Sequence, residues 1–205
     1  LGCFPQEVER RLRACDLVAK DIIATEINIA GSGASCECWY YGKKWQTEPA
    51  MHMQETCVTV TWMKFCQTLL RLTGDVTYAE ELEKTTYNAF LASLNPDVSS
   101  FSKYCPLEGI RGAGVGQCGM TINCCIANGP RGFFMLPEAA VMSNAGELAV
   151  NLYEDLQAQA TLKDGLDVAL AISGNYPANN RVCIAVTPSA KATWSLLLRI
   201  PAWSA

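Results

Sequence analysis

The segment GDVTYAEELEKTTYNAFLASLNPD, residues 74–97, carries the clearest helical pattern of the chain. Apolar side chains such as Tyr78 and Phe90 recur in it at helical spacing. Asp75 or Thr77 offers an N-terminal cap, and the run NPD predicts where the helix ends.

Two further segments are predicted to be helical. Residues 5–28 show helical spacing, and a second helix is predicted from Glu55 to residue 73, ended by Gly74. The β-branched residues 58–61 disfavour this second helix, so burial must decide its conformation. Residues 98–132 are dense in Gly and Cys and are predicted to form a long connection, with Cys124 and Cys125 in a bent loop.

The sequence pattern changes after about residue 137. The segments ELAVNLY, LDVALAISG, NRVCIAVTP and WSLLLRIPAW are short, apolar or alternating, and are separated by Gly, Pro and Asn. Strands that follow a run of helices indicate an α+β, multi-domain chain. We place the domains at residues 1–136 and 137–205.

The amino-acid composition argues against several classes of function. The chain has 205 residues and a formal net charge of −4, so nucleic acid and membrane are poor candidates for partners. Eleven cysteines are many for this length. Their number is odd, and several of them are clustered between residues 105 and 125. Both features favour reduced thiols and metal ligands over an extracellular disulfide scaffold. Cys15 and Cys66 lie in helical patterns and are predicted to be core residues.

Two motifs bring together the residues of a metal site. HMQETC contributes Glu55 and Cys57, and NCC contributes Cys124 and Cys125. One carboxylate and three thiolates match the four ligands that Zn²⁺ prefers. Glu55 and Cys57 can meet at one ion only if the chain is irregular where the helix starts, because residues i and i+2 diverge on a helix.

Several separated motifs, in order, resemble the β-L-arabinofuranosidase-like glycoside hydrolases of families 127 and 146. They are GSGASCECWYYGKKWQ, MQETC, LLRLTGDVTYAEELEKTTYNAFL, KYCPL, INCCIANGPRG and LLLRIPAW. The resemblance implies an (α/α)6 barrel followed by a β-sandwich, of which this chain would hold the C-terminal part of the barrel and the start of the sandwich. It also implies an internal fragment of a longer enzyme, whose partners are an arabinose-containing glycan and the missing remainder of the barrel.

The resemblance further implies roles for individual residues. A retaining hydrolase of this family uses a zinc-bound cysteine as nucleophile, which falls on Cys124, with Glu55, Cys57 and Cys125 as the other metal ligands. The acid/base glutamate falls on Glu37, although the spacing leaves Glu48 as a competitor. Tyr104 in KYCPL resembles a tyrosine that approaches the sugar.

Other functions stay open on the sequence. A non-catalytic, zinc-stabilised module that binds carbohydrate would need the same ligands, and a thiol redox protein would need no metal. Four further candidates are expected to be spectators of the metal site: Cys36, Cys38, Cys105 and Cys118. His52, the single histidine, is expected at the edge of the site and not as a ligand. The compartment is undetermined: cytoplasmic, periplasmic or secreted.

Overall fold

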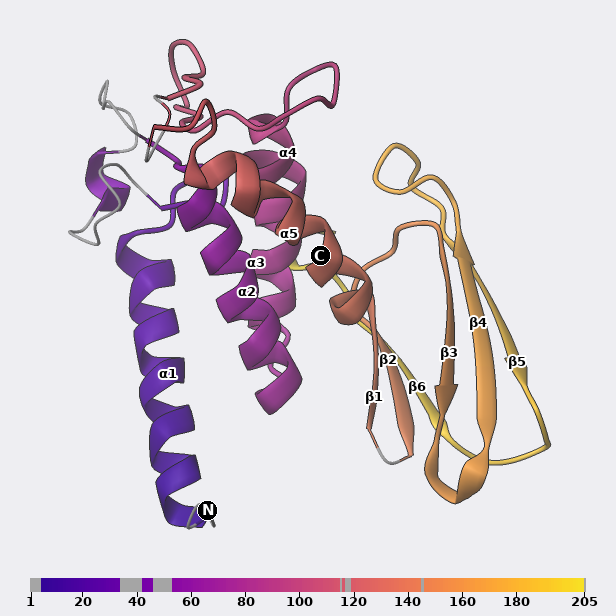
Figure 1. Ribbon diagram of the computed structural model, residues 1–205. Coiled ribbons are helices and arrows are strands. Elements are labelled where there is room, and N and C mark those ends of the chain that lie inside the picture. Colours follow the sequence, from indigo (N-terminus) through magenta and orange to yellow (C-terminus); the bar gives the residue numbers. More distant parts are fainter. Residues whose placement is uncertain are drawn as a thin grey trace. The chain divides into compact units, whose positions relative to one another are not determined.

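The computed structural model describes residues 5–33, 42–45, 53–114, 116, 119–144 and 146–204. The chain divides into two compact units, Leu1–Met135 and Leu136–Ala205 (Figure 1). The first contains helices and the second is dominated by strands. The predicted α+β class is confirmed.

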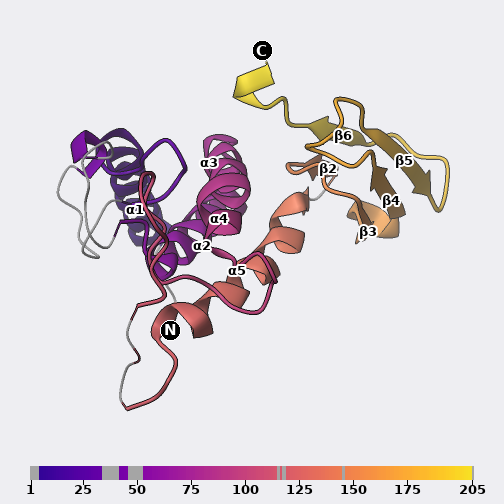
Figure 2. The same ribbon diagram turned by 90° about the horizontal axis from the view of Figure 1, so that it is seen from above.

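The helical unit is built from segments that begin and end close to the predicted positions. Its elements are α1 (Pro5–Thr25), η1 (Gly42–Trp45), α2 (Thr56–Thr73), α3 (Thr77–Thr85), the π-helical η2 (Thr86–Phe90), α4 (Leu91–Ser93) and most of α5 (Cys124–Ala140). Helix α2 contacts both α1 and α3 (Figures 1 and 2). The structure describes no helix that is long and apolar enough to cross a bilayer.

The structure confirms the helix predicted from Glu55 to residue 73, which is α2. It ends at Gly74, whose φ of 69° lies in the left-handed region and whose N–H donates to the carbonyl of Leu70 at 2.8 Å. The β-branched residues Thr59 and Val60 are buried, together with Trp62. Burial therefore outweighs their low helix propensity.

Helix α1 is less buried than its pattern predicts. Ala19 and Ile22 are buried, whereas Val18 is exposed. Cys15, predicted to lie in the core, is exposed, so that prediction was wrong. Cys66 on α2 is buried as predicted. Only the C-terminal part of α1 is buried among the described residues, which leaves the earlier apolar positions uncovered.

The helix predicted over residues 75–94 is interrupted. Asp75 accepts a hydrogen bond from the N–H of Thr77 at 2.9 Å, as a cap would. The N–H of Ala89 then donates to the carbonyl of Ala30 at 3.1 Å, outside the helix. This donor is diverted from the regular ladder in the middle of η2, which explains why the segment widens into a π-helix.

The predicted loop around Cys124 and Cys125 is wrong, because both residues lie in the first turn of α5. The Oδ1 atom of Asn123 accepts hydrogen bonds from the N–H groups of Cys125 (3.1 Å) and Ile126 (3.4 Å) and so caps the helix. The glycines that suggested a turn instead allow close packing. A Cβ on Gly129 would lie 2.4 Å from the ring of Phe101.

The second unit contains two three-stranded sheets. Their strands are β1 (Val141–Asn144), β2 (Glu147–Val150), β3 (Leu156–Thr161), β4 (Asp167–Ser173), β5 (Cys183–Pro188) and β6 (Ser195–Leu198). One sheet has the order β1-β2-β6, with β2 and β6 parallel, and the other is the antiparallel sheet β3-β4-β5. Leu148 and Val150 of one sheet share a core with Val168, Leu170 and Ile172 of the other.

Candidate metal centre

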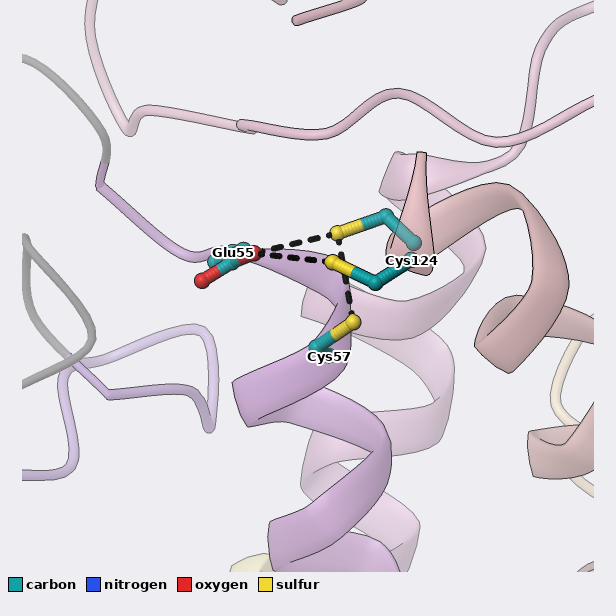
Figure 3. A group of neighbouring side chains, drawn as sticks. Glu55, Cys57 and Cys124 are labelled. Atoms are coloured by element: carbon teal, nitrogen blue, oxygen red, sulfur yellow. Dashed lines mark hydrogen bonds between the residues drawn. The ribbon is translucent and has the colours of Figure 1, made fainter. Parts of the chain in front are cut away.

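Four side chains meet where two helices begin. Glu55 and Cys57 belong to the start of α2, and Cys124 and Cys125 to the start of α5. One ligand atom from each lies within 4.8 Å of all the others. We call this group the thiol–carboxylate cluster; Figure 3 shows its members Glu55, Cys57 and Cys124 pointing toward one another.

The contacts within the cluster are short. The Oε1 atom of Glu55 lies 3.3 Å from the Sγ of Cys125 and 3.7 Å from the Sγ of Cys124 (Figure 3). The Sγ of Cys125 lies 3.5 Å from that of Cys57. None of the cysteines that the structure describes is in a disulfide.

The irregular helix start that the sequence requires is present. Glu55 precedes the first turn of α2 with an extended backbone (φ −60°, ψ 132°) and forms a β-bridge with Tyr104. Gln54, just before it, has a φ of 51°, a strained value for a residue with a side chain. This bend directs the Glu55 carboxylate to the same side as Cys57.

The four residues of the cluster differ in their exposure to solvent. Glu55 and Cys125 are buried, Cys57 is partly buried and Cys124 is exposed. One thiol of the cluster is therefore exposed and a second is partly accessible, whereas the carboxylate and the third thiol are buried.

The electrostatics of the cluster favour anionic ligands. The N-terminus of a helix carries a partial positive charge, and the N-termini of α2 and α5 both lie at this site. The ammonium of Lys103 lies 4.0 Å from the Oε1 of Glu55. The hydrogen bond to Tyr104, aided by the charge of Glu55, raises the pKa of Lys103 against the effect of burial, so this side chain stays charged.

Without a bound metal ion, the protonated form of the thiols is favoured. Burial, followed by the hydrogen bond to Cys57, raises the pKa of Cys124. The hydrogen bond to Cys57, followed by burial, raises the pKa of Cys125 far above its ordinary value. Four acidic groups this close cannot all ionise alone, whereas a divalent cation would bind them as anions. The donor set therefore fits a metal ion.

The other predicted residues divide into two groups. Tyr104 is half-buried beside the cluster, and its ring centroid lies 5.2 Å from the Nζ of Lys103. Cys105 is apart from the cluster, since its Sγ donates to the carbonyl of Ala92 at 3.4 Å. The remaining candidates lie outside the described residues: Glu37, Glu48, Cys36, Cys38, Cys118 and His52.

Sequence reasoning missed three residues that shape the site. Asn123 caps α5, and an Asn directly before an apolar helical run is a recognised start signal that the neighbouring glycines obscured. Gln54 supplies the backbone bend and Lys103 the buried charge. Neither has a sequence signal of its own.

Comparisons with known proteins agree with the motifs. Residues 8–138 match the profile of the β-L-arabinofuranosidase GH127 catalytic domain, and residues 147–205 match the GH127 middle domain. No curated protein matches the chain significantly.

Solved structures share the fold. A GH127 β-L-arabinofuranosidase from Geobacillus stearothermophilus T6 is 22% identical with a TM-score of 0.72, over 94% of this chain and 32% of that chain. A GH127 β-arabinofuranosidase is 24% identical with a TM-score of 0.77, over 94% and 30% of the two chains. A further glycoside hydrolase is 22% identical with a TM-score of 0.72, over 90% and 35%. The chain thus spans about a third of the length of these solved relatives.

Proposed function

The chain belongs to the GH127 β-L-arabinofuranosidase family, and on that premise we propose that it is part of a retaining glycoside hydrolase that removes terminal β-L-arabinofuranose. Because it spans only about a third of its solved relatives, we assign the activity to a polypeptide that also carries the rest of the barrel. In this proposal residues 1–136 are part of an (α/α)6 barrel and residues 137–205 are part of a β-sandwich.

The observation that carries the proposal is that Cys124 is the most exposed thiol of the cluster in this chain. Cys124 is exposed. Glu55, whose Oε1 lies 3.7 Å from the Sγ of Cys124, is buried, and so is the next residue in the chain, Cys125. A nucleophile must reach the anomeric carbon of a sugar, and ligands that only bind a metal need no such access. Cys124 is the proposed nucleophile, with Glu55, Cys57 and Cys125 as supporting ligands.

Zinc is the proposed ion, because three sulfurs and one carboxylate suit its tetrahedral preference. When bound, Zn²⁺ would keep the cysteine thiols deprotonated at neutral pH. The N-termini of α2 and α5 and the ammonium of Lys103 add positive potential at the same place.

The reaction proceeds in two displacements. The Cys124 sulfur forms a bond to the anomeric carbon as the bond to the departing oxygen breaks, and an acid donates its proton to that oxygen. The resulting carboxylate then removes a proton from water, whose oxygen bonds to the same carbon and displaces the sulfur. Two inversions give net retention, as in other retaining glycosidases.

Glu37 is the proposed acid/base, with Glu48 as its competitor. The family motif supports Glu37, and both residues lie outside the described part of the chain. Tyr104 is the proposed sugar contact, supported by its place next to Glu55 in the β-bridge. A net negative metal centre would favour the positively charged transition state of glycoside cleavage and would raise the pKa of a nearby glutamate, which keeps it protonated for its first task.

Trapping tests the nucleophile directly. We expect an electrophilic β-L-arabinofuranoside analogue to label Cys124 of the enzyme that contains this chain, as located by peptide mass mapping. Cys183 is a matched control, because it is also exposed and lies on β5, outside the cluster. Reversible binding without labelling would instead support a carbohydrate-binding module, and absence of metal with ready disulfide formation would support a redox protein.

A further inference from the structure

Lys103 is a buried cation beside the thiol–carboxylate cluster. Its side chain is 9% exposed, that of Glu55 is 1% exposed, and 4.0 Å separates Nζ from Oε1. A charged lysine is seldom buried unless it has a partner. The position of this charge therefore calls for an explanation.

The backbone fixes Lys103 from both sides. Its N–H donates to the carbonyl of Gly112 at 2.8 Å, and its carbonyl accepts from the N–H of Thr56 at 3.0 Å in the first turn of α2. The same carbonyl lies 3.8 Å from the Sγ of Cys125. Lys103 is thus joined to the elements that carry the ligands.

The side chain is also held along its length. A Cβ on Gly114 would lie 2.5 Å from Cδ and 2.8 Å from Cβ of Lys103. The backbone of Gly114 therefore packs directly against the aliphatic part of Lys103. Its ammonium is confined between Tyr104, whose ring centroid is 5.2 Å away, and Glu55.

The net charge of the metal-bound cluster explains why a buried cation lies beside it. A carboxylate and three thiolates around a divalent ion leave two net negative charges, in a site where two of the four ligands, Glu55 and Cys125, are buried. A buried net charge is costly unless an opposite charge lies nearby. Lys103 supplies that opposite charge.

We propose that Lys103 is a positioning residue of the metal centre: its ammonium orients the Glu55 carboxylate and offsets the negative charge of the ligand set. The inference rests on the proposed function only in so far as the cluster binds a divalent ion. It concerns a residue outside the ligand set.

Binding of Co²⁺ to the metal-stripped protein tests the inference, because thiolate–cobalt absorption reports the ligands without any turnover. We expect Lys103→Met to weaken Co²⁺ binding about 10–100-fold, the usual effect of losing a residue that supports metal ligands. The ligand-field bands should also shift, because the Glu55 carboxylate loses its contact with the Lys103 ammonium. Lys103→Arg, which keeps the charge, should restore most of the affinity.

Gly114→Ala tests the position of the charge rather than its presence. The new Cβ would displace the Lys103 side chain, so Co²⁺ binding should weaken although the lysine remains. Gly109→Ala is the matched control: Gly109 also has a positive φ, of 108°, but has no atom near enough to meet a Cβ. It should bind Co²⁺ as the wild type does.

The outcomes separate the two proposals. Wild-type affinity and an unchanged spectrum in Lys103→Met would overturn the role of Lys103 and leave the metal centre intact. Absence of Co²⁺ binding by the wild type would overturn the metal centre and this inference with it. If Lys103→Met does not fold, as judged by circular dichroism, Gly114→Ala against Gly109→Ala decides the question.

Discussion

The sulfur atoms of Cys57 and Cys125 lie 3.5 Å apart, although 68 residues separate them in the chain. Each belongs to the first turn of a different helix, so their contact joins the starts of α2 and α5. The separation exceeds a disulfide bond, about 2.05 Å, and suits two ligands of one ion. The geometry of the site therefore depends on how both helices begin.

The Cys57–Cys125 contact predicts a redox behaviour that metal suppresses. In the metal-stripped protein, diamide should oxidise this pair to a disulfide, because their sulfurs are already in contact. Peptide mass mapping would locate the bond, and a saturating divalent cation should prevent it. Bridging of Cys124 to Cys125 instead would contradict the geometry, since adjacent cysteines rarely reach the required Cα separation.

Asn123 caps α5 and so positions two of the ligands. Asn123→Ala removes the acceptor of two backbone N–H groups and should cost about 1 kcal/mol in the free energy of unfolding. It should also weaken metal binding, because Cys124 and Cys125 lie in the turn that frays. Asn123→Asp keeps the acceptor and should retain most of both properties. Denaturant titration and Co²⁺ titration would check the two effects, and an Ala variant with unchanged stability would contradict the assignment.

Two glycines of α5 are predicted to be intolerant of a side chain. A Cβ at Gly129 would meet the ring of Phe101 at 2.4 Å, and one at Gly132 would meet the ring of Phe90 at 2.4 Å. Each change to Ala should lower the free energy of unfolding by about 1–3 kcal/mol, as overpacking does. Gly146→Ala is the control, because nothing lies within 4 Å of its added Cβ. Denaturant unfolding that ranks Gly129→Ala level with this control would refute the close packing.

The hydrogen bond between Tyr78 and Asp16 is expected to make the stability of the fold depend on pH in the acid range. Lys20 and the 2.5 Å hydrogen bond from the Tyr78 hydroxyl lower the pKa of Asp16 below its ordinary value of 3.8. Because the folded pKa is the lower one, this contribution is present above pH 3.8 and is lost as the pH falls through the folded value. The wild type should therefore lose more stability than Asp16→Asn between about pH 5 and pH 2. Parallel stability curves for the two proteins would contradict the assignment.

The sequence predicted those parts of the fold that depend on local signals. The periodic pattern of α2 and the glycine that ends it were sufficient, as were the alternating segments that became β2, β4, β5 and β6. The π-helical η2 was not predictable, because it depends on a hydrogen bond from Ala89 to Ala30, far along the chain. The start of α5 was missed because the glycines of residues 98–132 suggested a connection. In the structure, Gly129 and Gly132 instead allow α5 to pack closely against Phe101 and Phe90.

The candidate site shows the same division. Motif resemblance was sufficient to group Glu55, Cys57, Cys124 and Cys125, and the structure brings their ligand atoms together. The bend at Gln54 and the buried charge of Lys103 have no local signal, since each is determined by contacts between distant segments. Roles that resemblance assigned to Glu37 and Tyr104 stay predictions.

X-ray absorption at the zinc edge tests the central claim most directly. Protein purified from zinc-containing medium should hold about one ion per chain, with three sulfur neighbours near about 2.3 Å and one oxygen near about 2.0–2.2 Å. Cys57→Ser should remove one sulfur from that shell, while Cys183→Ser should leave it unchanged. A protein without bound metal, or a shell made of oxygen and nitrogen alone, would contradict the claim that these four side chains form a metal centre.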